Sequence, residues 1–480
     1  MNKRHDRRSP SRTATTSPAL AYANHPRLYN PDSQSSSPRL NGHASRYDKG
    51  NYLKLSRIIS TRSWRPSSPV CNPSRASLLT GRYPQRTGSI DTLEWRGLER
   101  LDLNEVTIAD ILKGAGYRTG LIGKWHLGAF DPRYKPEKRG FDEAICFRGG
   151  MHDYYDWRLE SGDRVQRADG RYLTDFWTDE AIDFIKRSPK DPFYLHLTYN
   201  APHTPLQAPE EDLAVFRDRD DLSEAVKILY AMIRRLDRNV GRLLESVEQL
   251  GLRENTLIVF SSDNGPQFGG SGDDCLDRFN CQLHGSKGST YEGGIRVPAI
   301  VRWPAGLQQN DTGDNTFFHM CDWLPTILSF AGVEAPSTLK LDGVDQSAVL
   351  RGEVAPYHPQ RCWQWNRYDP LIEYNAAIRD GDWKLVRPFV PEAFEVPDIK
   401  WLDVSMYQPE HFIENGIITD PAPEVNLPAP PPVELYNLKN DPLEQTNLAK
   451  QSPHRVQRME RDLLAWFEDV CGDLKKTSRD

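Results

Sequence analysis

Residues 71–82 read CNPSRASLLTGR, a turn that leads into a short helix. Pro73 presets the backbone for a helix start, the Ser74 hydroxyl suits a cap, and Gly81 suits a C-terminal stop. The pattern therefore predicts that Cys71 lies at or just before a helix N-terminus, where the helix dipole favours an anion. Arg75 adds a positive charge one turn later. On these residues alone, an inert buried cysteine beside a structural arginine is an equal alternative.

A second pair of polar residues follows a predicted helix and strand. Residues 106–116 carry apolar side chains at helical spacing and end in glycines, and residues 117–123 are typical of a short buried strand. The strand leads to Lys124 and His126, which project to the same side of an extended segment because they lie two residues apart. A cation and a proton carrier at a strand end suit an anionic ester.

Two further predicted strands also end in polar residues. Residues 193–199 lead to His203, which lies in a proline-rich loop, and residues 255–262 lead to Asp263 and Asn264. Oxygen ligands from adjacent side chains suit Ca²⁺ or Mg²⁺, although Asp-Asn-Gly is also ordinary turn chemistry. Ligands of open α/β sheets bind at the carboxyl ends of the strands. The three strand ends therefore predict one cationic, metal-assisted pocket for a tetrahedral anion.

Four segments together resemble the sulfatase family. They are C-x-P-S-R with L-T-G-R at 71–82, G-Y-x-T-x-x-x-G-K-W-H at 116–126, S-D-N-G at 262–265 and K-G-x-x-x-E-G-G-x-R-x-P at 287–298. The resemblance covers about residues 68–450. It implies an α/β, alkaline-phosphatase-like sandwich with a largely parallel central sheet. A smaller C-terminal α+β domain with an antiparallel sheet completes the predicted fold.

The resemblance also implies a mechanism and a set of site residues. In the family, the cysteine is oxidised to formylglycine by a maturation enzyme, and the aldehyde is hydrated to a diol. One hydroxyl attacks sulfur, and the other later loses a proton and expels sulfate. The implied catalytic residues are Cys71, Arg75, Lys124, His126, His203 and Lys287, and the implied metal ligands, for Ca²⁺ or Mg²⁺, are Asp263 and Asn264.

The N-terminus departs from the family pattern. Sulfatases open with an apolar strand that ends in two adjacent aspartates, both calcium ligands, whereas residues 1–70 contain three isolated Asp residues and no Glu. The same segment holds 13 Lys and Arg residues and 13 Ser residues, a composition typical of a transit peptide or a disordered segment. Three explanations stay open: a mis-assembled start with native sequence resuming near residue 68, a metal-poor homologue, or a leader with replacement ligands.

Composition sets the remaining expectations. The 480 residues predict an atypical segment at 1–67, a catalytic domain at 68–355 and a C-terminal subdomain at 356–480, with a final helix at about 452–470. A net charge of −6 gives no reason to expect a nucleic-acid partner, and no stretch has the length of a membrane-spanning helix. No apolar secretory signal is present in the sequence, so the sequence does not indicate a location.

Cys275 and Cys281 bracket a short loop, and both a disulfide and independent thiols are compatible with that spacing.

The sequence thus predicts a sulfate ester hydrolase for small-molecule or carbohydrate sulfate esters, aryl sulfates included. It depends on a formylglycine-generating enzyme and is impaired by the missing Asp-Asp pair. One alternative is a phosphoryl or phosphonate ester hydrolase of the same superfamily. The others are a catalytically silent binding protein and a thiol enzyme that uses unmodified Cys71.

Overall fold

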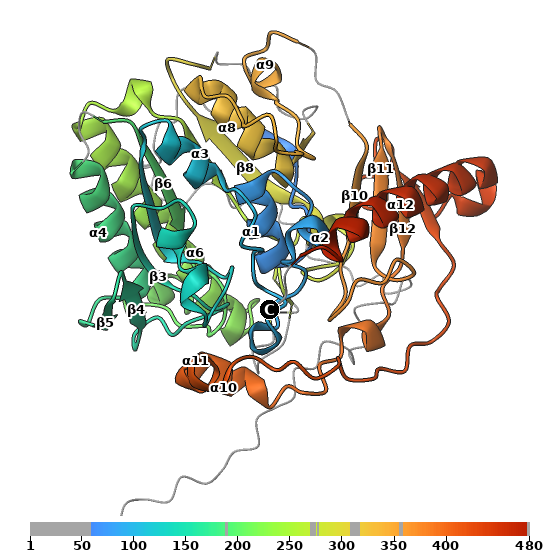
Figure 1. The fold of residues 1–480 in the computed structure, drawn as a ribbon, viewed down its shortest axis with the longest axis horizontal. Helices are drawn as coiled ribbons and strands as arrows, with labels where there is room; N and C mark the ends of the chain where they lie inside the picture. Colours follow the sequence, from blue (N-terminus) through green and yellow to red (C-terminus); the bar gives the residue numbers. More distant parts are fainter. Residues whose placement is uncertain are drawn as a thin grey trace, which may run out of the picture.

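The computed structural model describes residues 59–187, 191–268, 275, 278–307, 317–354 and 359–477 (Figure 1). One sheet has the strand order β5-β4-β3-β2-β6. Its strands are β2 (Arg118–Lys124), β3 (Glu143–Phe147), β4 (Arg158–Ser161), β5 (Arg164–Arg167) and β6 (Phe193–Thr198). β2 runs parallel to both β3 and β6, and β4 and β5 add an antiparallel hairpin at the far edge.

A second sheet has the order β7-β8-β1-β9. Its strands are β1 (Ile59–Arg65), β7 (Ile258–Ser261), β8 (Val297–Arg302) and β9 (Phe318–His319). β8 is antiparallel to both β7 and β1, whereas β1 is parallel to β9. The α/β fold class is confirmed, with parallel and antiparallel pairs mixed in both sheets.

Strand β1 lies upstream of residue 68, where the sequence predicts the catalytic domain to begin. Its Trp64 is fully buried and stacks on Phe318 and Trp323, with ring centroids 5.2 and 4.3 Å apart. Strand β1 therefore belongs to the second sheet, and its Trp64 lies in the core of that sheet. Residues 1–58, on which the other expectations for the N-terminus rest, are outside the described ranges.

Helices cover both faces of the first sheet (Figure 1). The main ones are α1 (Cys71–Thr80), α3 (Ile108–Gly114), α4 (Leu173–Lys186), α6 (Glu224–Gln249) and α8 (Trp323–Ala331). Other, shorter helices are α2 (Pro84–Thr87), α5 (Glu210–Leu213), α7 (Glu292–Ile295) and α9 (Ser347–Leu350), of which α5 packs on α6 and α9 on α8. Alternation along β2 places Leu121 in the cluster formed with α1, α3 and α8, and Ile122 in the cluster formed with α4 and α6. The predicted helix at 106–116 is thus confirmed as α3.

The C-terminal part forms an antiparallel sheet with the order β10-β11-β12-β13. Its strands are β10 (Arg361–Gln364), β11 (Ala376–Asp380), β12 (Trp383–Arg387) and β13 (Glu434–Asn437). The final helix, α12 (Pro453–Leu474), packs Val456, Met459 and Leu463 against it. The predicted antiparallel sheet and final helix are confirmed. Two short helices, α10 (Trp401–Tyr407) and α11 (Glu410–Asn415), leave this part and lie beneath the α/β sheets in Figure 1.

A buried network of four charges joins the two parts of the fold. Lys384 Nζ of β12 lies 3.1 Å from Glu292 Oε1 and 2.8 Å from Glu444 Oε1. Glu292 also pairs with Arg65 of β1, and the Glu292 N–H donates to Glu444 Oε2 at 2.7 Å. All four side chains are at most 3% exposed. The network therefore holds the loop at 287–296 between β1 and the C-terminal sheet.

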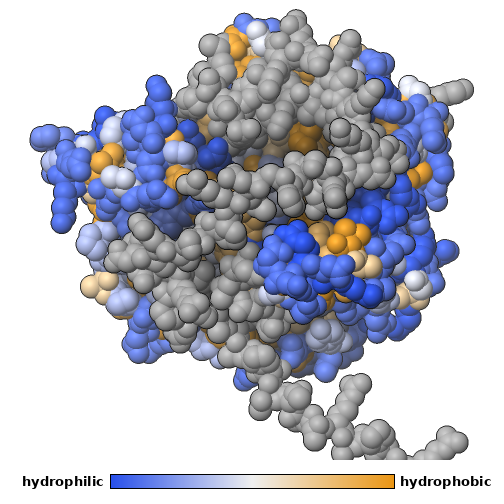
Figure 2. Space-filling model, turned by 180° about the vertical axis from the view of Figure 1, so that it is seen from behind, coloured by the Kyte–Doolittle hydropathy of each residue, from blue (hydrophilic) through white to orange (hydrophobic). Residues whose placement is uncertain are grey.

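Hydrophilic residues dominate the described surface on the reverse side, with small hydrophobic areas between them (Figure 2). None of the described helices combines the length and the apolar character needed to cross a bilayer.

Cys275 and Cys281 are both free thiols in the structure. Cys275 is buried and Cys281 is exposed.

Candidate active site

Helix α1 places Cys71 at its first position. Val70 is extended and precedes the helix, and Gly81, at φ 68°, ends it by donating its N–H to Ser77 O at 2.9 Å. The predicted cap at Ser74 is wrong, because the helix begins three residues earlier and the Ser74 hydroxyl instead donates to Ser68 O at 2.8 Å. Cys71 is 4% exposed. The sequence-based expectation that it lies at a helix N-terminus is confirmed.

His126 faces Cys71 from the end of β2. The N–H groups of Trp125 and His126 donate to the carbonyls of Phe147 and Arg148 at 3.0 Å, so the chain follows β3 beyond the last paired residue of β2. His126 then takes φ 58°, and its Nδ1 lies 3.4 Å from Cys71 Sγ. This left-handed backbone, which is uncommon outside glycine, turns the imidazole toward α1.

The amide of Asn72 fixes this arrangement from the other side. Its Nδ2 donates to the carbonyls of both His126 and Glu99 at 2.6 Å. Asn72 is fully buried, so α1 and the loop after β2 are held together next to the cysteine.

Arg75 connects three elements behind the cysteine. Its Nε donates to Asp263 Oδ2 at 2.9 Å, and an Nη donates to Lys124 O at 3.1 Å. These contacts bring the ends of β2 and β7 to the first turns of α1. Arg75 and Asp263 are 11% and 26% exposed, so the pair is partly shielded from water.

Lys287 and His203 form the opposite side of the site. Lys287 Nζ lies 3.3 Å from His203 Nε2, and the Lys287 N–H donates to Pro266 O at 2.8 Å. His203 Nδ1 lies 2.9 Å from Thr204 O, and a carbonyl only accepts. Nδ1 therefore carries the hydrogen, and Nε2 accepts from Lys287.

Positive charge dominates this cluster, since Arg75, Lys124 and Lys287 surround the carboxylate of Asp263. Burial alone would raise the pKa of Asp263, but the three cations hold it well below its usual range. Burial would likewise raise the pKa of the Cys71 thiol, and Lys124 and Lys287 outweigh that effect and lower it. Burial lowers the pKa of Lys124 itself. The arrangement suits a bound anion.

Both site histidines are neutral at ordinary pH. Burial, followed by the charges of Lys124 and Arg75, lowers the pKa of His126 well below its usual value. Burial and Lys287 do the same for His203. Each imidazole therefore has one N–H to donate and one nitrogen to accept a proton.

Asp263 and Asn264 supply an incomplete donor set for a divalent cation. Asn264 Oδ1 is buried and has no hydrogen-bond partner within the described ranges, which suits a metal ligand, but Asp263 Oδ2 is already engaged by Arg75. No three His, Cys, Asp or Glu side chains are grouped as a metal site in the described part of the chain. Ca²⁺ needs 6–8 oxygen ligands. The described residues thus do not by themselves complete a calcium site.

Glu94 also lies at the site, although it was not identified as a site residue from the sequence. Its Oε1 lies 3.3 Å from His126 Nε2, on the side of the ring opposite Cys71. It lies in a loop between apolar residues, and the structure folds that loop into a short 3-10 turn, Glu94–Arg96. No motif or spacing singles it out.

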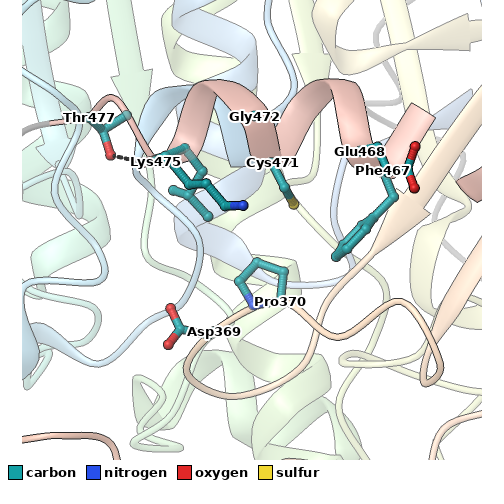
Figure 3. Close-up of a pocket in the computed structure, with 9 residues that line it drawn as sticks. Asp369, Pro370, Phe467, Glu468, Cys471, Gly472, Lys475 and Thr477 are labelled. Carbon is teal, nitrogen blue, oxygen red and sulfur yellow. Dashed lines mark hydrogen bonds between the residues drawn. The ribbon is translucent and has the colours of Figure 1, made fainter. Parts of the chain in front are cut away.

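A cavity of about 830 Å³ lies elsewhere, at the C-terminal helix (Figure 3). Phe467 and Cys471 point from α12 toward Pro370. None of the eight predicted site residues lines this cavity, so it is separate from the cluster around Cys71.

Comparison with known proteins agrees with the motifs. The family model "Sulfatase" matches residues 33–333, and the model of the N-sulphoglucosamine sulphohydrolase C-terminal region matches residues 284–404. The chain belongs to the sulfatase family. Membership places this sulfatase among the sulfuric ester hydrolases and confirms the resemblance found in the sequence.

Two mouse sulfatases illustrate the relationship. Arylsulfatase J of Mus musculus is 29% identical over 422 residues, which cover 82% of the chain and 68% of the relative. N-acetylgalactosamine-6-sulfatase of Mus musculus is 32% identical over 327 residues, which cover 61% of the chain and 59% of the relative. The chain thus spans about three fifths of the length of the second relative.

Solved structures confirm the alkaline-phosphatase-like fold. Ps i-CgsB, in complex with k-i-k-neocarrahexaose, superposes with a TM-score of 0.69 at 28% identity, covering 86% of this sulfatase and 85% of that chain. The phosphonate monoester hydrolase SpPMH of Silicibacter pomeroyi superposes with a TM-score of 0.56 at 20% identity, covering 86% and 88%. The second likeness is one of fold alone.

Proposed function

We propose that this sulfatase hydrolyses carbohydrate or aryl sulfate esters with a formylglycine made from Cys71. The supporting observation is the position of Cys71 at the start of α1, 3.4 Å from His126 and within the field of Lys124 and Lys287. A helix N-terminus and two lysines favour an anion at this point. A sulfate ester brings that negative charge on its non-bridging oxygens.

Each residue has a distinct task in the proposed reaction. A formylglycine at position 71 would supply a hydrated aldehyde whose hydroxyl is a nucleophile toward sulfur. Lys124 and Lys287 bind the sulfate oxygens and stabilise the charge that develops on them. His203, whose Nε2 accepts from Lys287, positions that ammonium group. Arg75 holds the carboxylate of Asp263 and the end of β2 in place through its two hydrogen bonds. His126 exchanges a proton with the group at position 71.

We further propose that Asp263 and Asn264 bind Ca²⁺ or Mg²⁺ only weakly. The two residues provide one negative charge, and three nearby cations oppose a divalent ion. Within the described ranges, β6 and β7 are edge strands, and Phe260 of β7 is 36% exposed. Both strands lead to site residues, so a further strand paired at either edge would bring additional ligands to the same place.

The identities of the relatives favour a carbohydrate ester. One relative is named N-acetylgalactosamine-6-sulfatase, and Ps i-CgsB is complexed with k-i-k-neocarrahexaose. A phosphonate or phosphoryl ester hydrolase is the second candidate, because SpPMH shares the fold. The C-x-P-S-R cysteine favours the sulfatase.

Activity on an aryl sulfate and on the matching aryl phosphate tests the proposal. The protein is co-expressed with a formylglycine-generating enzyme, and mass spectrometry of the peptide around Cys71 determines the fraction converted to aldehyde. We expect sulfate hydrolysis in proportion to that fraction and none in Cys71→Ala. An active preparation whose peptide retains the thiol, or a preference for the phosphate, would refute the assignment.

A further inference from the structure

Three side chains form a continuous row at the site. Cys71 Sγ lies 3.4 Å from His126 Nδ1, and His126 Nε2 lies 3.3 Å from Glu94 Oε1. All three residues are at most 5% exposed. His126 Nε2 has no hydrogen-bond partner in the described part of the chain, and the Glu94 carboxylate is the acidic group next to it.

These two atoms, 3.3 Å apart, are close enough to share a proton. A neutral imidazole that donates from Nδ1 presents a lone pair at Nε2, and an ionised carboxylate presents lone pairs as well. Two buried acceptors facing each other are unfavourable unless one of them carries a hydrogen. Either Nε2 donates to an ionised Glu94, or a protonated Glu94 donates to Nε2.

We propose that Glu94 is a positioning residue that orients His126 and takes up a proton when His126 receives one from the group at position 71. This proposal rests on the proposed function. In the starting state, Nε2–H donates to ionised Glu94, and Nδ1 accepts from the hydrogen at position 71. As the O–H bond at position 71 breaks, a new N–H bond forms at Nδ1. The Nε2–H bond breaks and an O–H bond forms on Glu94, so one proton leaves position 71, one reaches Glu94 and the ring ends neutral.

The backbone around Glu94 is built for close approach. The Gly150 N–H donates to the Glu94 carboxylate. A Cβ at Gly150 would lie 3.0 Å from both Glu94 Oε1 and His126 Nε2, so a side chain there would crowd the contact. The glycine thus leaves room for the carboxyl and the imidazole to meet.

A second set of contacts clamps the 3-10 turn that carries Glu94. Asp398 accepts from Trp95 Nε1 at 3.1 Å and from Arg96 Nε at 2.6 Å, and it also accepts from the Tyr368 hydroxyl at 2.8 Å. Trp95 and Tyr368 belong to one apolar cluster with Phe412 of α11. Asp398, just before α10, and Phe412 of α11 thus fix the turn, and the turn holds the carboxyl against His126.

The titration of Glu94 supports the same assignment. Burial, and next the negative charge of Glu99, raise the pKa of Glu94 to about 8. The Gly150 N–H and the charge of Lys124 oppose this shift, and Cys71 and His126 are the other titratable groups that face it. Because the relay starts from ionised Glu94, the rate should rise with pH through this value.

The His126 tautomer tests the proposal without any turnover. Nitrogen-15 NMR of histidine-labelled Cys71→Ala protein, with the His126 signals assigned by their loss in His126→Gln, reports which ring nitrogen carries the hydrogen. We expect a change from Nδ1–H to Nε2–H as the pH rises from about 6 to about 10. In Glu94→Gln, His126 should keep its hydrogen on Nδ1 over the whole pH range, because the glutamine amide donates to Nε2. The proposal would be overturned if the His126 tautomer did not change with pH in the Cys71→Ala protein. It would also be overturned if the tautomer changed over the same pH range when Glu94→Gln is added.

Kinetics of the matured enzyme provide a second test, with Glu99→Gln as the matched control. Glu99 is equally buried, but its Oε1 accepts from the Ala129 N–H. We expect Glu94→Gln to lower kcat on the order of 10²-fold with KM nearly unchanged, and to lose the acid limb. Glu99→Gln should keep the plateau kcat and move the acid limb to lower pH. Equal losses in both variants, matched by equal losses of Tm, would mean a merely structural role. The matured protein without substitutions could also fail to hydrolyse sulfate esters while the His126 tautomer changes with pH as expected. In that case the proposed function fails, and the role of Glu94 in orienting His126 stands.

Discussion

Lys384→Met should destabilise the protein far more than removal of an exposed lysine. Lys384 is fully buried, and its ammonium group is the cation nearest to Glu444. Glu292 keeps Arg65 as a partner after the substitution, whereas Glu444 loses its ion-pair partner. Methionine retains nearly the volume and shape of the lysine stem. The effect therefore reports the lost charge rather than a cavity.

The size of the effect follows from leaving a charge buried without its partner. Breaking a buried pair from one side costs about 3–5 kcal/mol. At about 2 cal/mol/K of unfolding entropy per residue, a chain of this length that unfolds as one unit would lose about 3–5 °C of Tm. The matched control is Lys340→Met, because Lys340 is 61% exposed and its pair with Asp469 contributes at most about 1 kcal/mol.

The loss should also depend on pH with a definite sign. Burial raises the pKa of Glu444 above its unfolded value, and Lys384 opposes that rise. A carboxyl with a raised folded pKa costs stability as pH rises from the unfolded pKa to the folded one. Without Lys384 the folded pKa rises further, so the extra loss should grow above neutral pH by up to about 1.4 kcal/mol per pH unit.

Thermal and urea unfolding followed by circular dichroism, at mildly acidic and at mildly alkaline pH, measure this loss. The double variant Lys384→Met/Glu444→Gln removes the stranded carboxylate and should recover much of the stability at alkaline pH. The reasoning fails if Lys384→Met costs no more than Lys340→Met. It also fails if the double variant is no more stable than the single one.

Two further predictions concern the catalytic and metal sites. Lys124→Ala and Lys287→Ala should each lower turnover on the order of 10²–10³-fold, because each removes a preorganised cation from the sulfate site; near-normal kcat in a steady-state assay would mean that the pocket is misplaced. Isothermal titration of Ca²⁺ into the 480-residue chain should give weak binding. A variant with an apolar strand ending in Asp-Asp ahead of Ser68 should bind Ca²⁺ more tightly and hydrolyse sulfate esters faster. Sub-micromolar Ca²⁺ binding by the unaltered chain would point to substitute ligands.

The local elements of the fold could be predicted from the sequence because their signals are local. Helical spacing identified α3, and the apolar run before Asp263 identified β7. The helix start near Cys71 and its stop at Gly81 follow from backbone preferences of neighbouring residues. The cap at Ser74 was wrong, since the tertiary hydrogen bond to Ser68 determines where that hydroxyl points.

The chemistry of the candidate site was also readable in part. Residues at the carboxyl ends of strands converge in an α/β fold, so Lys124, His203 and Asp263 could be grouped before any geometry was known. Their pairings could not be predicted. That Arg75 engages Asp263, and that Lys287 meets His203, depends on the positions of α1 and of the loop at 287–296.

The sequence by itself determined the family, the layered α/β fold with its antiparallel C-terminal sheet, and the residue types of the anion site. Only the tertiary structure decided that Glu94 stands behind His126, and that Arg65, Glu292, Lys384 and Glu444 share one buried network. Arg65 and Glu292 are 227 residues apart in the chain, and Glu292 and Lys384 are 92 apart. A buried charge is tolerated only beside its partner, and the path of the chain between two distant positions determines whether that partner arrives.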